Sequence, residues 1–250
     1  MTQGLLRSSL CIAISAMAIT WVFGTGNGFA DVVHEGAHQR ADSTHAPAHS
    51  ASPSDLAETE EGRQYSLLMH RSSGLVLIGV GLLLFADRLT SRRYRGIRIG
   101  IGLLWLVLGL HIMVNSDRPQ WPLGAGFVES FSIPGAGEWL QHKILALLPL
   151  GLGAYTILSR PASPTPLRCY GIAALLTLGA LGLLFHEHLH EPGMDMELID
   201  RQHHFMALTS LYIAGAVLVD GLDRIPPRSK LFLLPVGMLV LGLQLAFYAE

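Results

Sequence analysis

The sequence predicts an all-α membrane protein: a bundle of about six transmembrane helices that follows a cleavable signal peptide. Only 14% of the 250 residues are charged, whereas soluble domains carry roughly 25%. Mean hydropathy is +0.41, and five or six apolar runs approach the roughly 20 residues that a helix needs to cross a bilayer. Helices are expected because lipid offers no hydrogen-bond partners to an open sheet edge.

Residues 1–30 have the pattern of an export signal, and residues 31–62 have that of a polar tail. Arg7 precedes the apolar stretch SLCIAISAMAITWVF, and small residues lead to Ala30, after which a signal peptidase would cut. A retained anchor helix is the alternative. The tail is rich in Ala, Ser, Pro, His and acidic residues without apolar periodicity, so we expect a disordered extracytoplasmic segment. Its four histidines fit either a solvated linker or a loose metal-collecting tail.

Residues 63–250 form the predicted six-helix transmembrane domain. Ten Lys and Arg residues lie in the loops after the first, third and fifth spans, and six lie on the opposite side, tail included. The positive-inside rule therefore predicts a multi-pass membrane protein with these ten residues in the cytoplasm and both mature termini extracytoplasmic. The spans expected from the apolar runs are 67–86, 96–114, 139–158, 170–185, 205–222 and 231–248.

The net charge argues against a nucleic-acid-binding protein, and the cysteine content argues against a disulfide-stabilised one. The formal net charge is −2, which does not suit a nucleic-acid partner. Cys11 lies in the predicted signal and leaves Cys169 alone in the mature chain, so no structural disulfide is expected.

All twelve histidines lie on the predicted outer side of the membrane. A general preference of histidine for helix ends does not explain why five different helices use the same interface. Imidazole suits copper, zinc, iron and nickel, while thioether sulfur selects Cu(I). Five methionines after the signal lie on the same side, and only Met238 lies away from it. The sequence therefore predicts a periplasm-facing His/Met metal site, with copper favoured.

The segment FHEHLHEPGMDMELIDRQHH, residues 185–204, connects the fourth and fifth spans and holds five of the histidines. In a helix, His186 and His190 share one face and His188 points away; in an extended chain, His186 and His188 form an H-x-H clamp. The spelling H-E-x-x-H also matches a zinc-protease pattern, but here it meets a Pro-Gly pair at a helix end. We interpret that match as incidental and assign no enzyme activity.

Several short motifs resemble bacterial inner-membrane proteins related to the copper-resistance D group. They are MHRSSG at the first span, SDRPQWPLG and FVESF in the next outer loop, LQHKILALL opening the third span, and the spacing from the H-x-H pair to His203. The resemblance covers about residues 65–222. It implies a polytopic helical protein in copper transport or resistance, with the lipid bilayer and a periplasmic copper carrier or another membrane subunit as partners. The metal-binding residues that it implies are His70, His142, His186, His188 and His203.

Other residues of the outer side are secondary candidates. A carboxylate that accepts a hydrogen bond from the distal ring nitrogen usually supports a metal-bound histidine, and Glu138, Glu187 and Asp200 are predicted for that role. Asp117 and Glu129 of the outer loop are further possibilities. The additional metal-ligand candidates are His111, His190, His204, Met194, Met196 and Met206.

Two alternatives to a copper site are open at the level of sequence. A b-type haem could be held between histidines of facing helices, such as His70 and His142, in a membrane electron-transfer subunit. The inner side has no histidine for a second haem. The other alternative is a structural membrane subunit without a metal.

Overall fold

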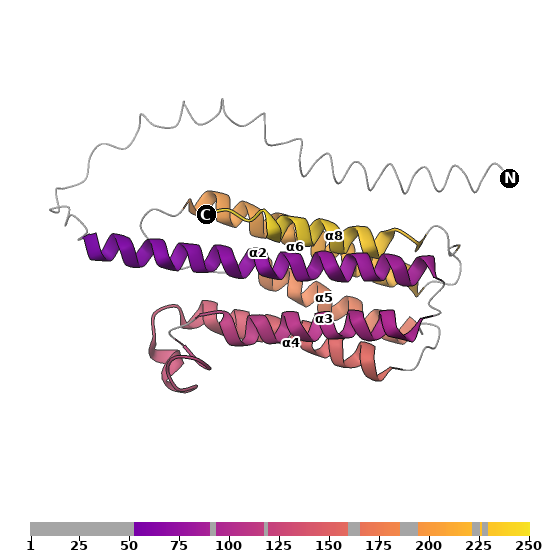
Figure 1. The fold of residues 1–250 in the computed structure, drawn as a ribbon, viewed down its shortest axis with the longest axis horizontal. Helices are drawn as coiled ribbons and strands as arrows, with labels where there is room; N and C mark the ends of the chain where they lie inside the picture. The colour runs from indigo at the N-terminus through magenta and orange to yellow at the C-terminus, as the bar shows by residue number, and fades with distance from the viewer. Residues whose placement is uncertain are drawn as a thin grey trace, which may run out of the picture. The chain divides into compact units, whose positions relative to one another are not determined.

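The computed structural model describes residues 53–90, 94–117, 120–159, 166–185, 195–221, 226 and 230–250. Within these ranges the regular elements are all helical, so the all-α prediction is confirmed for this part of the chain (Figure 1). The predicted signal peptide lies outside the described residues. The elements are α2 (Pro53–Leu89), α3 (Arg95–Asn115), η2 (Glu129–Ser132), α4 (Ala136–Leu158), α5 (Pro166–Leu184), α6 (Met196–Asp220) and α8 (Leu233–Ala246).

Two helices begin well before the starts expected from apolar runs. α2 begins at Pro53, so its first turns pass through residues that composition had assigned to the disordered tail. α6 begins at Met196, where the Asp195 side chain accepts a hydrogen bond from the Leu198 backbone N–H at 3.0 Å. Such a cap starts a helix in polar sequence, whereas an apolar run marks only the part of a helix that can face lipid.

Three helical stretches of the described chain are long and apolar enough to cross a membrane: Gly62–Leu89, Arg95–Asn115 and Leu167–Leu184. Their exposed faces carry large apolar side chains such as Leu82 and Leu103, which suit contact with lipid. α8 is apolar but shorter, at 14 residues. α4 and α6 are long but have ionisable residues in their first turns, and neither belongs to this set.

The helices of Arg63–Glu250, one unit of the chain, pack as a closed ring. α3 packs on α4, α4 on α5, α5 on α6, and α6 on α8. α2 closes the ring because Gly74 lies against Gly242 of α8 on one side, and Leu83 lies beside Gly100 of α3 on the other. The buried apolar core is drawn from α2, α3, α5, α6 and α8.

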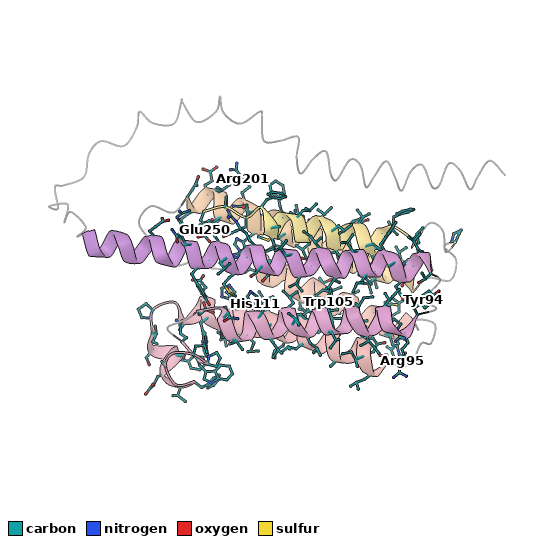
Figure 2. All side chains as sticks on the ribbon, viewed as in Figure 1. Tyr94, Arg95, Trp105, His111, Arg201 and Glu250 are labelled. Carbon is teal, nitrogen blue, oxygen red and sulfur yellow. The ribbon has the colours of Figure 1, made fainter. Side chains whose placement is uncertain are left out.

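An ion pair joins α2 to α6 at the end of the ring where α2 ends. The guanidinium of Arg88 donates two hydrogen bonds to the Asp220 carboxylate, at 2.6 and 2.8 Å. Both side chains are largely buried, and a bidentate pair of this kind also fixes geometry. Tyr94 and Arg95 lie at this same end, while His111, Arg201 and Glu250 lie at the opposite end (Figure 2).

The contact between α3 and α4 leaves no room for a side chain at Gly153. A Cβ atom there would lie 2.7 Å from the carbonyl oxygen of Gly102. On the same helix, a Cβ atom at Gly151 would meet nothing within 4 Å. Alanine substitutions at these two glycines therefore distinguish the effect of overpacking at the α3–α4 contact from the effect of alanine on helix propensity.

We expect Gly153→Ala to lower the melting temperature of the detergent-purified protein. Overpacking costs about 1–3 kcal/mol, which exceeds the gain of about 1 kcal/mol that alanine brings to a helix interior. Gly151→Ala is the control and should leave the melting temperature unchanged or raise it. Equal effects of the two substitutions in thermal unfolding would contradict the close α3–α4 contact.

Candidate metal site in the central cavity

A cavity of about 300 Å³ lies inside the ring and is lined by side chains from all six α-helices. Its wall is apolar over most of its length, with Leu77, Trp105 and Met238 among the lining residues. Polar and ionisable groups gather at the end where α4 and α6 begin. The lining groups of this polar end include His70, His142, His203, Asp117 and Glu138.

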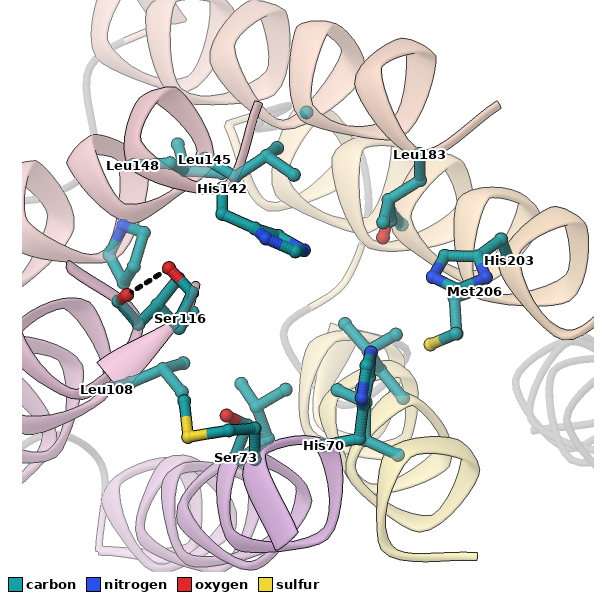
Figure 3. A pocket seen from close by; sticks show the side chains of 18 of the residues that line it. His70, Ser73, Leu108, Ser116, His142, Leu145, Leu148, Leu183, His203 and Met206 are labelled. Atoms are coloured by element: carbon teal, nitrogen blue, oxygen red, sulfur yellow. Dashed lines mark hydrogen bonds between the residues drawn. The ribbon is translucent and has the colours of Figure 1, made fainter. Parts of the chain in front are cut away.

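Three histidines from three helices point toward the same space: His70 of α2, His142 of α4 and His203 of α6 (Figure 3). The Nδ1 atoms of His70 and His203 lie 2.9 Å from the carbonyl oxygens of Ser66 and Ile199, each one turn earlier in its own helix. A carbonyl oxygen only accepts hydrogen bonds, so Nδ1 carries the proton in both rings and the lone pair of the neutral ring is on Nε2.

His142 also donates a hydrogen bond from Nδ1, and its acceptor is a residue of the preceding loop. Its Nδ1 lies 3.1 and 3.2 Å from the two carboxylate oxygens of Asp117. An ionised carboxylate is an acceptor only, so Nδ1–H of His142 donates to it. Lys143 lies 3.8 Å from the same carboxylate and donates to the carbonyl and hydroxyl oxygens of Ser116 at 2.8 and 2.9 Å.

The environment of Asp117 stabilises its charged form. Burial by itself would raise the pKa of Asp117, but the hydrogen bond and electrostatic interaction with His142, the hydrogen bond with Ser116 and the charge of Lys143 outweigh burial and lower that pKa. The Asp117 backbone has φ 60°, in the left-handed region, which aspartate tolerates better than most residues. The α3–α4 connection thus presents a carboxylate to the first turns of α4.

Ligand atoms of Asp117, Glu138 and His142 lie within 4.8 Å of one another, which is close enough to surround an ion. The His142 Nδ1 atom, however, already donates to Asp117, and one ring nitrogen cannot donate a proton and bind an ion together. We therefore interpret Asp117 as a hydrogen-bond support for His142, whose Nε2 carries the lone pair.

The rings of His70 and His203 are close enough to share one ion. Their centroids are 6.0 Å apart and the rings are nearly perpendicular, at 85°. Rings that bind one ion through bonds of about 2 Å have centroids roughly 5 to 6 Å apart. Met206 of α6 is only 2% exposed and lines the same cavity, as does Met69 of α2.

The cavity brings together only part of the predicted set. His111 does not line it: Nε2 is bonded to the Ser72 hydroxyl at 2.7 Å and Nδ1 to the Asn115 amide at 3.2 Å. His204 and Asp200 are exposed on α6, and the Ile199 carbonyl accepts the His203 Nδ1–H bond that had been considered for Asp200.

The remaining predicted residues fall into two groups. Glu138 lines the cavity near His142, whereas Met196, in the first turn of α6, does not line it. His186, Glu187, His188, His190 and Met194 lie outside the described residues.

The sequence-based reasoning missed two features of the site. Tyr248, fully buried beside His70, had no signal in its sequence neighbourhood. Met238 lines the cavity although its position in the sixth span had placed it away from the histidines. Asp117 had been noted only as one of several loop carboxylates, because its pairing with His142 joins residues that are 25 positions apart.

We expect Asp117→Asn to lower the melting temperature near neutral pH, because a hydrogen bond to a charged group contributes about 1.5–3 kcal/mol. The pKa of Asp117 is lower in the folded protein, so its contribution is complete above the ordinary carboxyl pKa of about 4 and is lost as pH falls through the lowered value. The difference between wild type and variant should therefore shrink under acid conditions.

Thermal unfolding across a pH series measures this difference. Glu129→Gln, in the exposed part of the same loop, is the control and should have little effect at any pH. A wild-type advantage over Asp117→Asn that persists undiminished at about pH 2, well below the ordinary carboxyl pKa of about 4, would contradict the stabilising role of the ionised form.

Comparison with known proteins identified no relative of this chain. No protein-family model, curated protein or solved structure matches the chain. The copper-resistance D resemblance therefore stays a prediction from short motifs.

Proposed function

We propose that this chain is an inner-membrane protein that binds copper in the polar end of its cavity, through His70, His142 and His203 together with Met206, and that it serves in copper transport or resistance. One observation carries the proposal. Three imidazoles from separate helices line one cavity, and each donates its Nδ1–H to an acceptor. Metal-binding histidines usually have this support, which orients the ring and raises the basicity of Nε2.

The donor set favours copper over zinc, and Cu(I) over Cu(II). Imidazole nitrogen is compatible with both metals, but thioether sulfur selects Cu(I). Met206 is buried and Met69 lines the same cavity. Transfer of charge into a buried site is costly, and Cu(I) brings half the charge of Zn²⁺. The apolar wall of the cavity therefore also favours the monovalent ion.

The size of the cavity argues against the haem alternative. About 300 Å³ is at the lower limit for pockets that hold small organic ligands. A porphyrin with its substituents is larger than most such ligands, whereas one ion and its side-chain ligands need little free volume.

The proposal includes six helices that cross the membrane, with the polar end of the cavity on the periplasmic side. Three candidate spans and their apolar exposed faces support a membrane setting. At the opposite end, Arg88 bonds Asp220, and Arg98 donates to the carbonyl of Ser159 at 2.9 Å. Basic residues at that end agree with the positive-inside rule. A periplasmic copper carrier or another membrane subunit is the proposed exchange partner.

Metal analysis and an absorption spectrum of the purified protein test the proposal. We expect bound copper and no strong haem band. His142→Ala combined with His203→Ala should abolish copper binding, because it removes ligands from two helices. His204→Ala, which changes an exposed neighbour on α6, is the control and should retain copper. A haem band, or copper content unaffected by the double substitution, would reject the proposed site.

Methionine substitutions test the preference for Cu(I). Met206→Leu conserves volume, which usually costs less than about 1.5 kcal/mol, so the fold should persist. We expect Cu(I) affinity to fall by roughly tenfold or more, as for other losses at metal sites, while Cu(II) affinity changes little. Met196→Leu is the matched control, since Met196 is on the same helix but does not line the cavity. Equal Cu(I) affinities of the two variants in a chelator competition would exclude the Met206 sulfur as a ligand.

A further inference from the structure

The segment that follows α8, residues 247–250, is bound to both α2 and α6. Ala249 exchanges two hydrogen bonds with the Gln202 side chain of α6: its N–H donates at 3.1 Å and its carbonyl accepts at 2.7 Å. On α2, Arg71 donates to the Tyr248 carbonyl from two guanidinium nitrogens, both at 3.3 Å. The Ser66 hydroxyl donates to the Glu250 carboxylate.

These bonds place the Tyr248 ring against both His70 of α2 and His203 of α6, so that the three rings form one cluster. The ring is stacked on His70, with centroids 3.9 Å apart and planes at 18°. It meets His203 edge to face, at 5.8 Å and 82°. Tyr248 is fully buried, so this contact with both imidazoles is shielded from solvent.

A metal site needs more than the Nδ1 hydrogen bonds of its histidines. A bond from Nδ1 to a carbonyl fixes one point of the ring, and the χ2 torsion of histidine is broad. Each ring can therefore rock about that bond, which moves Nε2. A flat aromatic surface against one ring and an edge against the other removes this freedom.

We propose that Tyr248 is a positioning residue that sets the relative orientation of His70 and His203 so that both Nε2 atoms can bind one ion. This inference rests on the proposed copper site and deepens it. Tyr248 acts through its ring, which is buried against both histidines.

Two substitutions at one position separate the ring from the hydroxyl. Tyr248→Phe keeps the stacked ring, and Tyr248→Leu removes it. Phe247→Leu changes an exposed ring of the same segment and is the control. Cu(I) affinity is measured by competition with a chromophoric chelator on the full-length protein in detergent. Thermal unfolding of each variant accompanies the titration and shows whether it is folded.

We expect Tyr248→Leu to weaken Cu(I) binding by about tenfold to a hundredfold, the usual effect of losing a group that orients metal ligands, while Tyr248→Phe and Phe247→Leu stay close to wild type. A Tyr248→Leu protein with wild-type affinity would overturn the proposal. So would a Tyr248→Phe protein that loses as much affinity as Tyr248→Leu, because the hydroxyl would then carry the effect.

A second measurement does not depend on copper. Nitrogen NMR of ¹⁵N-histidine-labelled, metal-free protein reports the ring environment of each histidine, with His70→Gln and His203→Gln used for assignment. We expect the His70 and His203 signals to shift or broaden in Tyr248→Leu and to be retained in Tyr248→Phe. Unchanged signals in Tyr248→Leu would overturn the positioning role. A wild-type protein that binds no copper would reject the proposed function, and these spectra alone would then decide the positioning role.

Discussion

The hydrogen bond from Nδ1 of each cavity histidine is the interaction on which the rest of the site depends. An imidazole inside an apolar bundle needs a partner for its polar atoms, and the identity of that partner decides which nitrogen keeps the lone pair. On α2 and α6 the partner is a carbonyl one turn earlier, so the helix that carries the histidine also supports it. On α4 the partner is the carboxylate of Asp117, which belongs to the connection from α3. The site therefore needs that connection as well as three helices.

The two helices that carry His70 and His203 are joined at both ends of the bundle. At one end the Arg88–Asp220 pair links α2 to α6 with two short hydrogen bonds. At the other end residues 247–250 bond Arg71 and Ser66 of α2 and Gln202 of α6. Between these ends α2 contacts α8 at Gly74 and Gly242, where backbone meets backbone. These two links, with α8 packed closely against α2, leave α2 and α6 little freedom to separate, which suits the proposed site with His70 on one helix and His203 on the other.

The apolar pattern predicted the helical regions, but it did not separate the histidines that face the cavity from the others. The set implied by the copper-resistance D resemblance did include the described histidines that line the cavity, which are His70, His142 and His203. Apolar runs mark lipid-facing length, and that property is local. The rotation of a helix about its axis depends on its contacts with other helices. His111 and His70 lie at the same end, yet His111 bonds Ser72 and Asn115. The early start of α6 depends on the Asp195 cap, which a search for apolar runs does not detect. Two contacts of the site join positions that are distant in the sequence: Asp117 pairs with His142, and Tyr248 stacks on His70. Such contacts cannot be predicted from the residue pattern of a single sequence.

The distribution of polar groups along the cavity bears on how a bound ion would be exchanged. The nitrogen and carboxylate groups lie at one end, while the deeper wall is formed by residues such as Leu77, Trp105 and Leu176. Ser73, Ser210 and Met238 are the side chains of that deeper wall that carry oxygen or sulfur among the described lining residues. An ion that moved inward would lose all three imidazoles and gain little in return, so exchange at the polar end costs less. Ser66, which lines this end, also bonds Glu250. The segment that we propose orients His70 and His203 therefore lies beside the end through which an ion would enter or leave.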